Sequence, residues 1–397
     1  MSMILAERSN LISPSATLAM AAEAKRLKAG GMHVLDFALG EPDFTTPENI
    51  QEAALRAMRS GHTHYTAAAG IAELRQALAE HYTRTQGLPT DAAQVVISNG
   101  AKQSIHNALM ALCGPGDEVI IPAPYWVSYA DLVKLTGATP VVIATPESGG
   151  FKLTPDAFLD AVSPRTKLVM INSPSNPTGA VYERGELTAL ADAVLRTDVG
   201  VLSDEIYEQL TYGDAVPTCF ATLRPGLAER TVTISGVSKT YAMTGWRIGW
   251  AVAPLPVAKF MGDLQSQETS NPCSISQWAA LEAITGPQES VAAMRAEFGR
   301  RRAYVLERIA GLPGITCLSP GGAFYAFMNV SSHFGRTLRG QVITDSTSFC
   351  LTALAEAHVA LVMGSAFGAE GYARLSFATS MATIEEGFDA LEGFLKA

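Results

Sequence analysis

The sequence predicts an α/β fold whose central sheet is mostly parallel and covered by helices. Three observations support this prediction. Short apolar runs alternate with helical patterns between residues 94 and 253, as expected when helices connect parallel strands. Apolar residues make up 48% of the chain and charged residues 17%, which is typical of a folded globular protein. The length of 397 residues is large for one hydrophobic core and suits two closely joined domains.

The region before residue 94 is expected to hold helices and one short strand. The first helix has apolar residues on one face and basic residues in its last turn, where they suit the helix dipole. Gly30 and Gly31 are expected to end it. In chain order we expect a helix over residues 13–30, a strand over 34–40, a proline-rich turn over 40–50 and a helix over 48–61.

The alternating region supplies the strands of the parallel sheet. Helices that cover both faces leave such strands buried and apolar. The expected strands are residues 94–98, 117–122, 139–144, 167–172, 199–207, 231–235 and 248–253. The expected helices between them are residues 99–113, 125–137, 154–162 and 183–197.

The pattern changes near residue 285, where we expect a domain boundary. A long helix over residues 287–312 leads into shorter strands and helices, which indicate an α+β region. We therefore expect residues 1–45 to form an N-terminal arm and part of a small domain. Residues 46–285 would form a large domain, and residues 286–397 the small C-terminal domain.

Composition and charge argue against several classes of protein. The net charge of -9 disfavours nucleic acid or an anionic membrane as a partner. The first ten residues lack the features of a signal peptide, and no apolar run is long enough for a bilayer, so we expect a cytoplasmic protein. The five scattered cysteines have no CxxC spacing and are expected to be reduced. His62 and His64 alternate without a third partner, so no metal site is expected.

The candidate functional residues stand at the ends of the expected strands, where open α/β sheets bind ligands. Lys239 follows the strand over 231–235. A lysine amine can form a Schiff base with a carbonyl, and pyridoxal phosphate (PLP) is the carbonyl cofactor most often held in this way. A lone lysine in a loop is more often a solvated surface residue, so this interpretation needs support from other residues.

A phosphate site is expected where the strand over 94–98 meets a helix. Gly100, Ala101 and Lys102 open that helix, and its free N–H groups and dipole suit an anion. A glycine is also common in ordinary strand–helix turns. The sequence has no GxGxxG motif, which argues against an NAD-dependent oxidoreductase.

Three polar residues could complete a site around Lys239. Asn176 could direct its amide at a ligand oxygen, or only shape an Asn-Pro turn. Asp204 could pair with a protonated pyridine nitrogen, or cap the following helix. Arg374 could bind a substrate carboxylate, although a carboxylate of the chain itself is the more frequent partner. Together with Lys239 and the phosphate site, these residues fit a PLP enzyme.

At these residues the sequence resembles the class I/II aminotransferases of fold type I, and most closely the bacterial aspartate aminotransferases of subgroup Ib. The resemblance covers nearly the whole chain, from SPSATLA to RLSFATS. The motifs that carry it are GEPDF, NGAKQ, PYWVSY, NSPSNPTGAVY, SDEIYEQLTY, GVSKTYAMTGWRIGW, QSQETSNPCSISQWAA and GGAFYAF.

The resemblance implies a PLP-dependent transferase with a large domain and a smaller α+β domain built from the N-terminal segment and the C-terminal part. It implies a homodimer with active sites at the subunit interface. The expected reaction is transamination between L-aspartate and 2-oxoglutarate, which gives oxaloacetate and L-glutamate.

The resemblance also implies roles for individual residues. Lys239 would hold PLP as a Schiff base and move the proton, and Asp204 would pair with the pyridine nitrogen. Tyr207 and Asn176 would hydrogen-bond the ring 3-oxygen, and Trp126 would stack on the ring. The phosphate region would be held by Gly100, Ala101, Lys102, Ser238, Arg247 and, from the neighbouring subunit, Tyr65. The substrate would be bound at its α-carboxylate by Gly40 and Arg374, with Trp126 and Asn176 alongside, and at its distal carboxylate by Thr17 and Lys102, with Ser15 nearby.

The sequence departs from the subgroup at two positions. Ser13 stands where a basic residue is usual, and because that residue is associated with larger dicarboxylates such as prephenate, its absence argues against them. Met363 replaces a usual proline before GSAFG, a change that we expect to be harmless.

Several alternatives remain open at this stage. One is an aminotransferase of related specificity, acting on glutamate and prephenate, aromatic amino acids or alanine. Another is a PLP-dependent β-lyase, which would release ammonia. A transcription regulator with an aminotransferase-like domain would need a basic DNA-binding module before that domain, and the expected catalytic region begins close to Met1.

Overall fold

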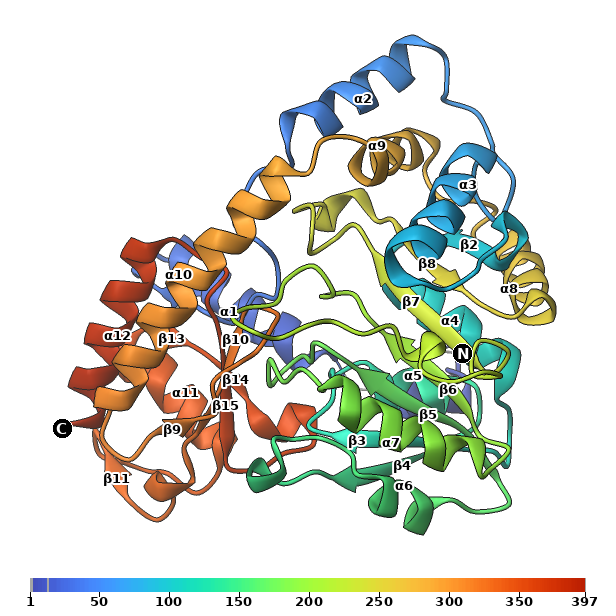
Figure 1. Cartoon of the computed structure of the whole chain (residues 1–397). Helices are drawn as coiled ribbons and strands as arrows, with labels where there is room; N and C mark the ends of the chain where they lie inside the picture. Colours follow the sequence, from blue (N-terminus) through green and yellow to red (C-terminus); the bar gives the residue numbers. More distant parts are fainter. Residues whose placement is uncertain (1–2, 13, 397) are drawn as a thin grey trace.

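The computed structural model describes residues 3–12 and 14–396. The described residues form one large sheet at the centre of the molecule (Figure 1). Its strands, in spatial order, are β2 (Val95–Ser98), β8 (Gly249–Val252), β7 (Thr231–Gly236), β6 (Gly200–Asp204), β5 (Thr166–Asn172), β3 (Glu118–Ala123) and β4 (Thr139–Ala144). β8 pairs antiparallel with β2 and β7, and the other neighbouring strands pair in parallel. The prediction of a mostly parallel sheet is confirmed.

Helices cover both faces of this sheet, which is why its central strands β6 and β7 are buried along nearly their whole length. Successive residues of β3 show the alternation: Val119 and Ile121 belong to one core cluster, and Ile120 belongs to another. The first cluster is closed by α4 (Ala101–Leu112), α5 (Tyr129–Leu135) and α8 (Leu255–Glu268). The second is closed by α6 (Pro155–Ala161) and α7 (Arg184–Leu195). At the β2 end a third cluster lies under α2 (Glu48–Arg59), α3 (Ala72–His81) and α9 (Ser274–Thr285).

The C-terminal part packs as a separate layer beside the sheet. It begins with the long helix α10 (Glu289–Gly311), drawn in orange in Figure 1. An antiparallel sheet follows, in the order β14 (Val362–Met363), β15 (Tyr372–Ser376), β10 (Tyr325–Asn329) and β9 (Thr316–Cys317). The remaining elements are the β11 (Thr337–Leu338) and β12 (Gln341–Val342) pair, α11 (Ser346–Ala357) and α12 (Met381–Leu395).

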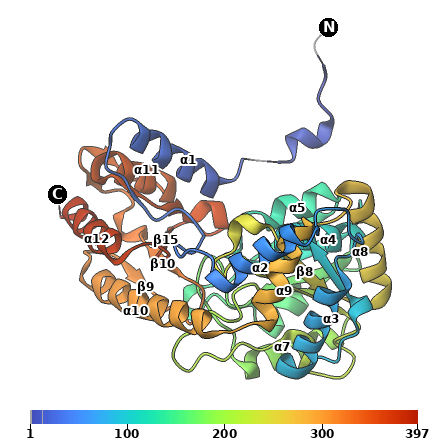
Figure 2. The same ribbon diagram turned by 90° about the horizontal axis from the view of Figure 1, so that it is seen from above.

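The N-terminal segment joins this C-terminal part. β1 (Leu35–Asp36) pairs in parallel with β13 (Val359–Ala360), and Met20 and Ala24 of α1 (Ala16–Ala29) belong to a cluster that includes Phe367. The smaller α+β layer built from both chain ends is therefore confirmed. Figure 2 shows residues 3–12 lying away from the body. The domain boundaries at residues 45 and 285 stay predictions.

Several expected elements differ in extent. The strand expected over 199–207 ends at Asp204, because the chain turns there and Glu208 N bonds back to Glu205 O. The helix expected over 125–137 begins only at Tyr129. α8 and α9 were not predicted. α9 was missed because its polar and apolar residues are spread around the helix and form no apolar stripe. Within residues 3–12 and 14–396, no helix combines the length and apolar character needed to cross a membrane.

Candidate active site

A pocket of about 400 Å³ lies at the carboxyl ends of the parallel strands, where the C-terminal layer meets the sheet. Residues after β5, β6 and β7 line it together with the start of α4, the start of α1 and Arg374 of β15. The pocket brings together all the predicted site residues except Gly100 and Tyr65. These are Thr17, Gly40, Ala101, Lys102, Trp126, Asn176, Asp204, Tyr207, Ser238, Lys239, Arg247 and Arg374.

Lys239 lies in the loop after β7 and is partly buried. Its Nζ donates a hydrogen bond to the carbonyl oxygen of Gly40 over 2.5 Å. Burial lowers the pKa of Lys239 to about 8; Arg374 and Arg247 act in the same direction, and Glu41 opposes them. A lowered pKa leaves more of the amine neutral near neutral pH, and only the neutral amine can act as a nucleophile or base.

Asp204 ends β6 and is 4% exposed. Its carboxylate accepts hydrogen bonds from Tyr129 Oη over 2.6 Å and from the Ile206 N–H over 3.3 Å. Burial raises the pKa of Asp204 to about 6, although both hydrogen bonds and the charge of Lys239 lower it. The residues that follow form a turn and no helix, so the helix-cap interpretation is wrong. A cationic group in the pocket would ionise this carboxyl fully.

Arg374 is 1% exposed, and its guanidinium has only neutral partners. Nη1 donates to Asn176 Oδ1 over 2.9 Å, and Nη2 donates to the Ala38 carbonyl oxygen over 2.7 Å. The guanidinium lies over the Tyr325 ring at 4.5 Å, while Nε has no hydrogen-bond partner. No carboxylate of the described residues pairs with it, so the expectation of an internal partner is wrong. A buried charge without a counter-ion is costly, so the site suits an anionic ligand.

The start of α4 forms a cradle with Arg247. Gly100 precedes the helix with a φ of 84°, and a Cβ there would lie 2.3 Å from Arg247 Nη2. Only glycine therefore allows the guanidinium to lie against this turn. The first N–H groups of α4 have no partner within the helix, and together with Arg247, Lys102 and Ser238 they suit a phosphate. Burial and then the charge of Arg247 lower the pKa of Lys102, whose Nζ lies 4.9 Å above the Trp126 ring centre.

Two aromatic residues of this region were missed in the sequence. Tyr129 holds Asp204, and Tyr325 shares a 2.8 Å hydrogen bond between its Oη and Tyr207 Oη. Tyr129 stands in PYWVSY and Tyr325 in GGAFYAF, but their partners lie 75 and 118 residues away. No local pattern could have paired them.

Besides Gly100, which adjoins the lining residue Ala101, Tyr65 is the predicted site residue that does not line the pocket. It is 90% exposed in the segment between α2 and α3. Ser15 does line the pocket close to Thr17, whereas Ser13 lies outside the described residues. Met363 lies in β14.

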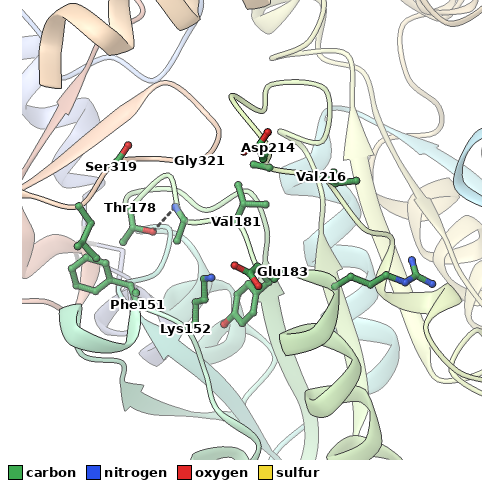
Figure 3. Close-up of a pocket in the computed structure, with 15 residues that line it drawn as sticks. Phe151, Lys152, Thr178, Val181, Glu183, Asp214, Val216, Ser319 and Gly321 are labelled. Carbon is green, nitrogen blue, oxygen red and sulfur yellow. Dashed lines mark hydrogen bonds between the residues drawn. The ribbon is translucent and has the colours of Figure 1, made fainter.

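A second cavity, of about 570 Å³, lies between the loop after β5 and the loop before β10 (Figure 3). Two of its polar side chains already have partners: Lys152 pairs with Glu186 over 2.6 Å, and Tyr182 Oη accepts from the Leu153 N–H over 2.7 Å. It holds none of the predicted site residues. Although it is larger, this cavity lacks the convergent unpaired groups that mark a catalytic site.

The histidine pair near Tyr65 does not form a metal site with other residues. His62 packs on the Trp278 ring with centroids 4.4 Å apart. Across the described part of the chain, no group of three or more His, Cys, Asp and Glu side chains could hold a metal ion.

Comparison with known proteins gives consistent matches over the whole chain. The family described as "Aminotransferase class I and II" matches residues 32–391. The aspartate/prephenate aminotransferase of Cereibacter sphaeroides is 48% identical, over 96% of each chain. The aspartate aminotransferase of Geobacillus stearothermophilus is 46% identical, over 100% of each chain. Among solved structures, the aspartate aminotransferase from Rhizobium meliloti superimposes with a TM-score of 0.96 at 42% identity, covering 100% of this chain and 99% of that one.

Proposed function

The chain belongs to the class I and II aminotransferases, and we propose that it transfers the amino group between L-aspartate and 2-oxoglutarate, giving oxaloacetate and L-glutamate. One observation carries this proposal: a buried arginine without a carboxylate partner, Arg374, shares a pocket with the amine of Lys239 and the carboxyl of Asp204. The proposal of L-aspartate as the substrate rests on relatives whose names include aspartate.

The proposed cofactor is PLP, which the residues of the pocket would fit. The cradle that Gly100 keeps open beside Arg247 suits the phosphate, with Ala101, Lys102 and Ser238. Asp204, whose pKa burial raises to about 6, suits a protonated ring nitrogen, because the positive charge of that nitrogen would favour the ionised carboxylate. Tyr207 and Asn176 would bind the ring oxygen, and Trp126 would cover one face of the ring. When bound, PLP supplies a carbonyl for Lys239 and a ring that takes up the electrons of the broken Cα–H bond.

The chain's own residues would then position the substrate and move one proton. Arg374 would bind the α-carboxylate through its planar guanidinium and fix the orientation of the Cα–H bond. Lys239 Nζ, with a pKa lowered to about 8, would take the proton from Cα as a free base and return it on the cofactor side. Asp204 would stay ionised throughout and would stabilise the positive charge of the ring nitrogen beside it.

The preference for a dicarboxylate would come from the far side of the pocket. Thr17 of α1 and Lys102 of α4 line the pocket together with Ser15. These residues would bind the distal carboxylate. Prephenate is a second candidate substrate, because the relative from Cereibacter sphaeroides carries prephenate in its name.

We propose a homodimer with active sites at the subunit interface. Two exposed regions support it. The arm before α1 carries the apolar residues Met3, Ile4 and Leu5 at 99%, 95% and 77% exposure (Figure 2), and Tyr65 is 90% exposed. An exposed apolar arm suits a partner surface, and Tyr65 would reach the partner's phosphate site. The proposed compartment is the cytoplasm, in keeping with five free thiols.

A panel of amino donors with 2-oxoglutarate tests the proposed function. We expect L-aspartate to give oxaloacetate and glutamate in equal amounts, with a higher kcat/KM than alanine, phenylalanine or tyrosine. Prephenate with glutamate as donor belongs to the same panel. Release of ammonia without glutamate would indicate a β-lyase and would contradict the proposal.

A further inference from the structure

The segment GEPDF, residues 40–44, connects the lysine of the pocket to helix α10. At its first residue, the Gly40 carbonyl oxygen accepts the hydrogen bond from Lys239 Nζ. Next to it, Glu41 Oε2 accepts a hydrogen bond from Thr244 Oγ1 over 2.7 Å. Two residues further on, Asp43 pairs with Arg301 of α10. The segment is thus held at the pocket and at a helix of the C-terminal layer.

Arg301 holds Asp43 in one orientation. Its side chain is 5% exposed, and Nη1 and Nη2 donate to the two carboxylate oxygens of Asp43 over 2.7 and 3.0 Å. Its Nε donates to Glu297 Oε1 over 2.8 Å. The guanidinium also lies over the rings of Phe44 and Phe298, at 5.0 and 5.6 Å. Because the planar group binds both oxygens at once, it fixes the direction of Asp43 as well as its distance.

The short chain between Asp43 and Gly40 can transmit this constraint. Pro42 lies between them, is buried, and restricts its own φ. At Gly40 the backbone passes close to Tyr325: a Cβ there would lie 2.7 Å from the Tyr325 hydroxyl. With the Tyr325 ring on one side and the paired carboxylate of Asp43 on the other, movement of the Gly40 carbonyl is restricted.

The charged groups that face Lys239 come from four parts of the chain. Glu41 and Asp204 are negative, whereas Arg374 and Arg247 are positive. After burial itself, Glu41 has the largest influence on the pKa of Lys239, and it acts against burial. The position of the Gly40–Glu41 peptide therefore affects the Lys239 amine in two ways. The Gly40 carbonyl accepts its hydrogen bond, and the Glu41 carboxylate raises its pKa.

We propose that the Asp43–Arg301 pair is a positioning device for Lys239, which holds the Gly40 carbonyl against the amine and keeps the Glu41 carboxylate near it. Asp43 and Arg301 act only through the segment and touch neither substrate nor cofactor. The role in turnover rests on the proposed function, but the effect on the amine does not.

The test measures the titration of Lys239 in the full-length chain freed of cofactor. Trace acetylation with acetic anhydride over a range of pH, followed by mass spectrometry of the peptide that holds Lys239, gives the midpoint of the amine. In Asp43→Asn we expect this midpoint to fall by about one pH unit, because the amine loses a fixed acceptor and a fixed negative neighbour. Arg301 keeps Glu297 as a partner, so the variant should fold.

Glu297→Gln is the matched control, because it removes the other carboxylate of Arg301 but leaves residues 40–44 paired. Its midpoint should equal that of the unchanged chain. Arg301→Lys keeps the charge but loses the two-point contact, so its midpoint should fall as in Asp43→Asn. A lower melting temperature with an unshifted midpoint in Asp43→Asn would mean a structural role only and overturn the proposal. An equal shift in Glu297→Gln would overturn it as well.

The same titration separates this proposal from the proposed function. It uses no amino or oxo acid, so a shifted midpoint supports the positioning role even if the donor panel gives no oxaloacetate. In steady-state assays, Asp43→Asn should shift the pH profile of kcat by the same amount and in the same direction as the labelled amine.

Discussion

Asp204 and Glu205 follow one another at the end of β6, yet their side chains lie in different surroundings. Both are 4% exposed, and burial raises both pKa values, to about 6 for Asp204 and about 7 for Glu205. Asp204 lines the pocket that holds Lys239. Glu205 turns away from it and accepts hydrogen bonds from Ser203 Oγ over 2.8 Å and the Phe220 N–H over 3.1 Å.

The surroundings of Glu205 include a second buried acid and no cation. Glu208 is 7% exposed, and burial, with the charge of Glu205 adding to it, raises its pKa to about 8. Its hydrogen-bond donors, Gln86 and Ser235, are neutral. Burial alone therefore raises the pKa of a carboxyl. A carboxyl can take part in a reaction where a cation can reach it. Glu205 and Glu208 are buried away from the pocket and carry their protons as part of the core.

The largest expected effect contrasts the two neighbours directly. Asp204→Asn removes the charge beside the proposed ring nitrogen and should lower kcat by about 10²–10³-fold, the usual loss when one group that stabilises developing charge is removed. Glu205→Gln makes the same chemical change at a carboxyl that faces away from the pocket, and it should leave kcat nearly unchanged. Steady-state assays of both variants check this prediction. Equal losses in the two variants would break the comparison.

A smaller effect is expected on the cationic side of the pocket. Among the described residues Arg374 pairs with no carboxylate, so we assign its guanidinium to the carboxylate of the substrate. Arg374→Lys keeps a charge but loses the two-point contact, and the KM for L-aspartate should rise by about 10–100-fold, the equivalent of one charged hydrogen bond. Measuring KM and kcat separately checks this. An unchanged KM for the amino acid would show that the guanidinium does not bind it.

The smallest effect concerns how the buried acid Glu208 makes the stability of the fold depend on pH. The folded-state pKa of Glu208 lies above its ordinary value of 4.5, so its contribution to stability is complete below about pH 4.5 and is lost as the pH rises towards 8. Glu208→Gln imitates the protonated acid and should lose nothing over this range. At pH 8.5 the variant should be more stable by more than about 1 kcal/mol, and at pH 4.5 the two should be similar. Urea unfolding at both pH values measures it; a difference that does not depend on pH would contradict the raised pKa.

Much of the fold could be predicted, because strands with helices between them leave a regular apolar pattern. The seven strands of the large sheet were all expected, with errors mainly at their ends. α9 was missed since it is buried on nearly every side and its sequence has no polar face to mark a helix. The turn after Asp204 was also missed, because Ile206 and Tyr207 are residue types that favour strands and so extend the strand-like sequence.

The site could be predicted in its residues but not in its contacts. Lys239, Asp204, Asn176 and Arg374 stand at strand ends or in motifs, and the fold brings them to one pocket. Which buried acid faces the pocket could not be read from the sequence, since it depends on the last pleat of β6. That no described carboxylate pairs with Arg374 is likewise a property of the whole packing, and the Tyr129–Asp204 contact joins segments that no local pattern relates.

We assign the amine of Lys239 as the group that carries a carbonyl cofactor, whereas Glu205 and Glu208, which face away from the pocket, take no part. Reduction of the purified protein with borohydride, followed by peptide mass spectrometry, tests it most directly, with Lys239→Ala treated in the same way as the blank. We predict a phosphopyridoxyl group on Lys239 alone, and no such group in the variant, which should still fold but not turn over. A modified lysine elsewhere, or an unmodified Lys239 in active protein, would contradict the account.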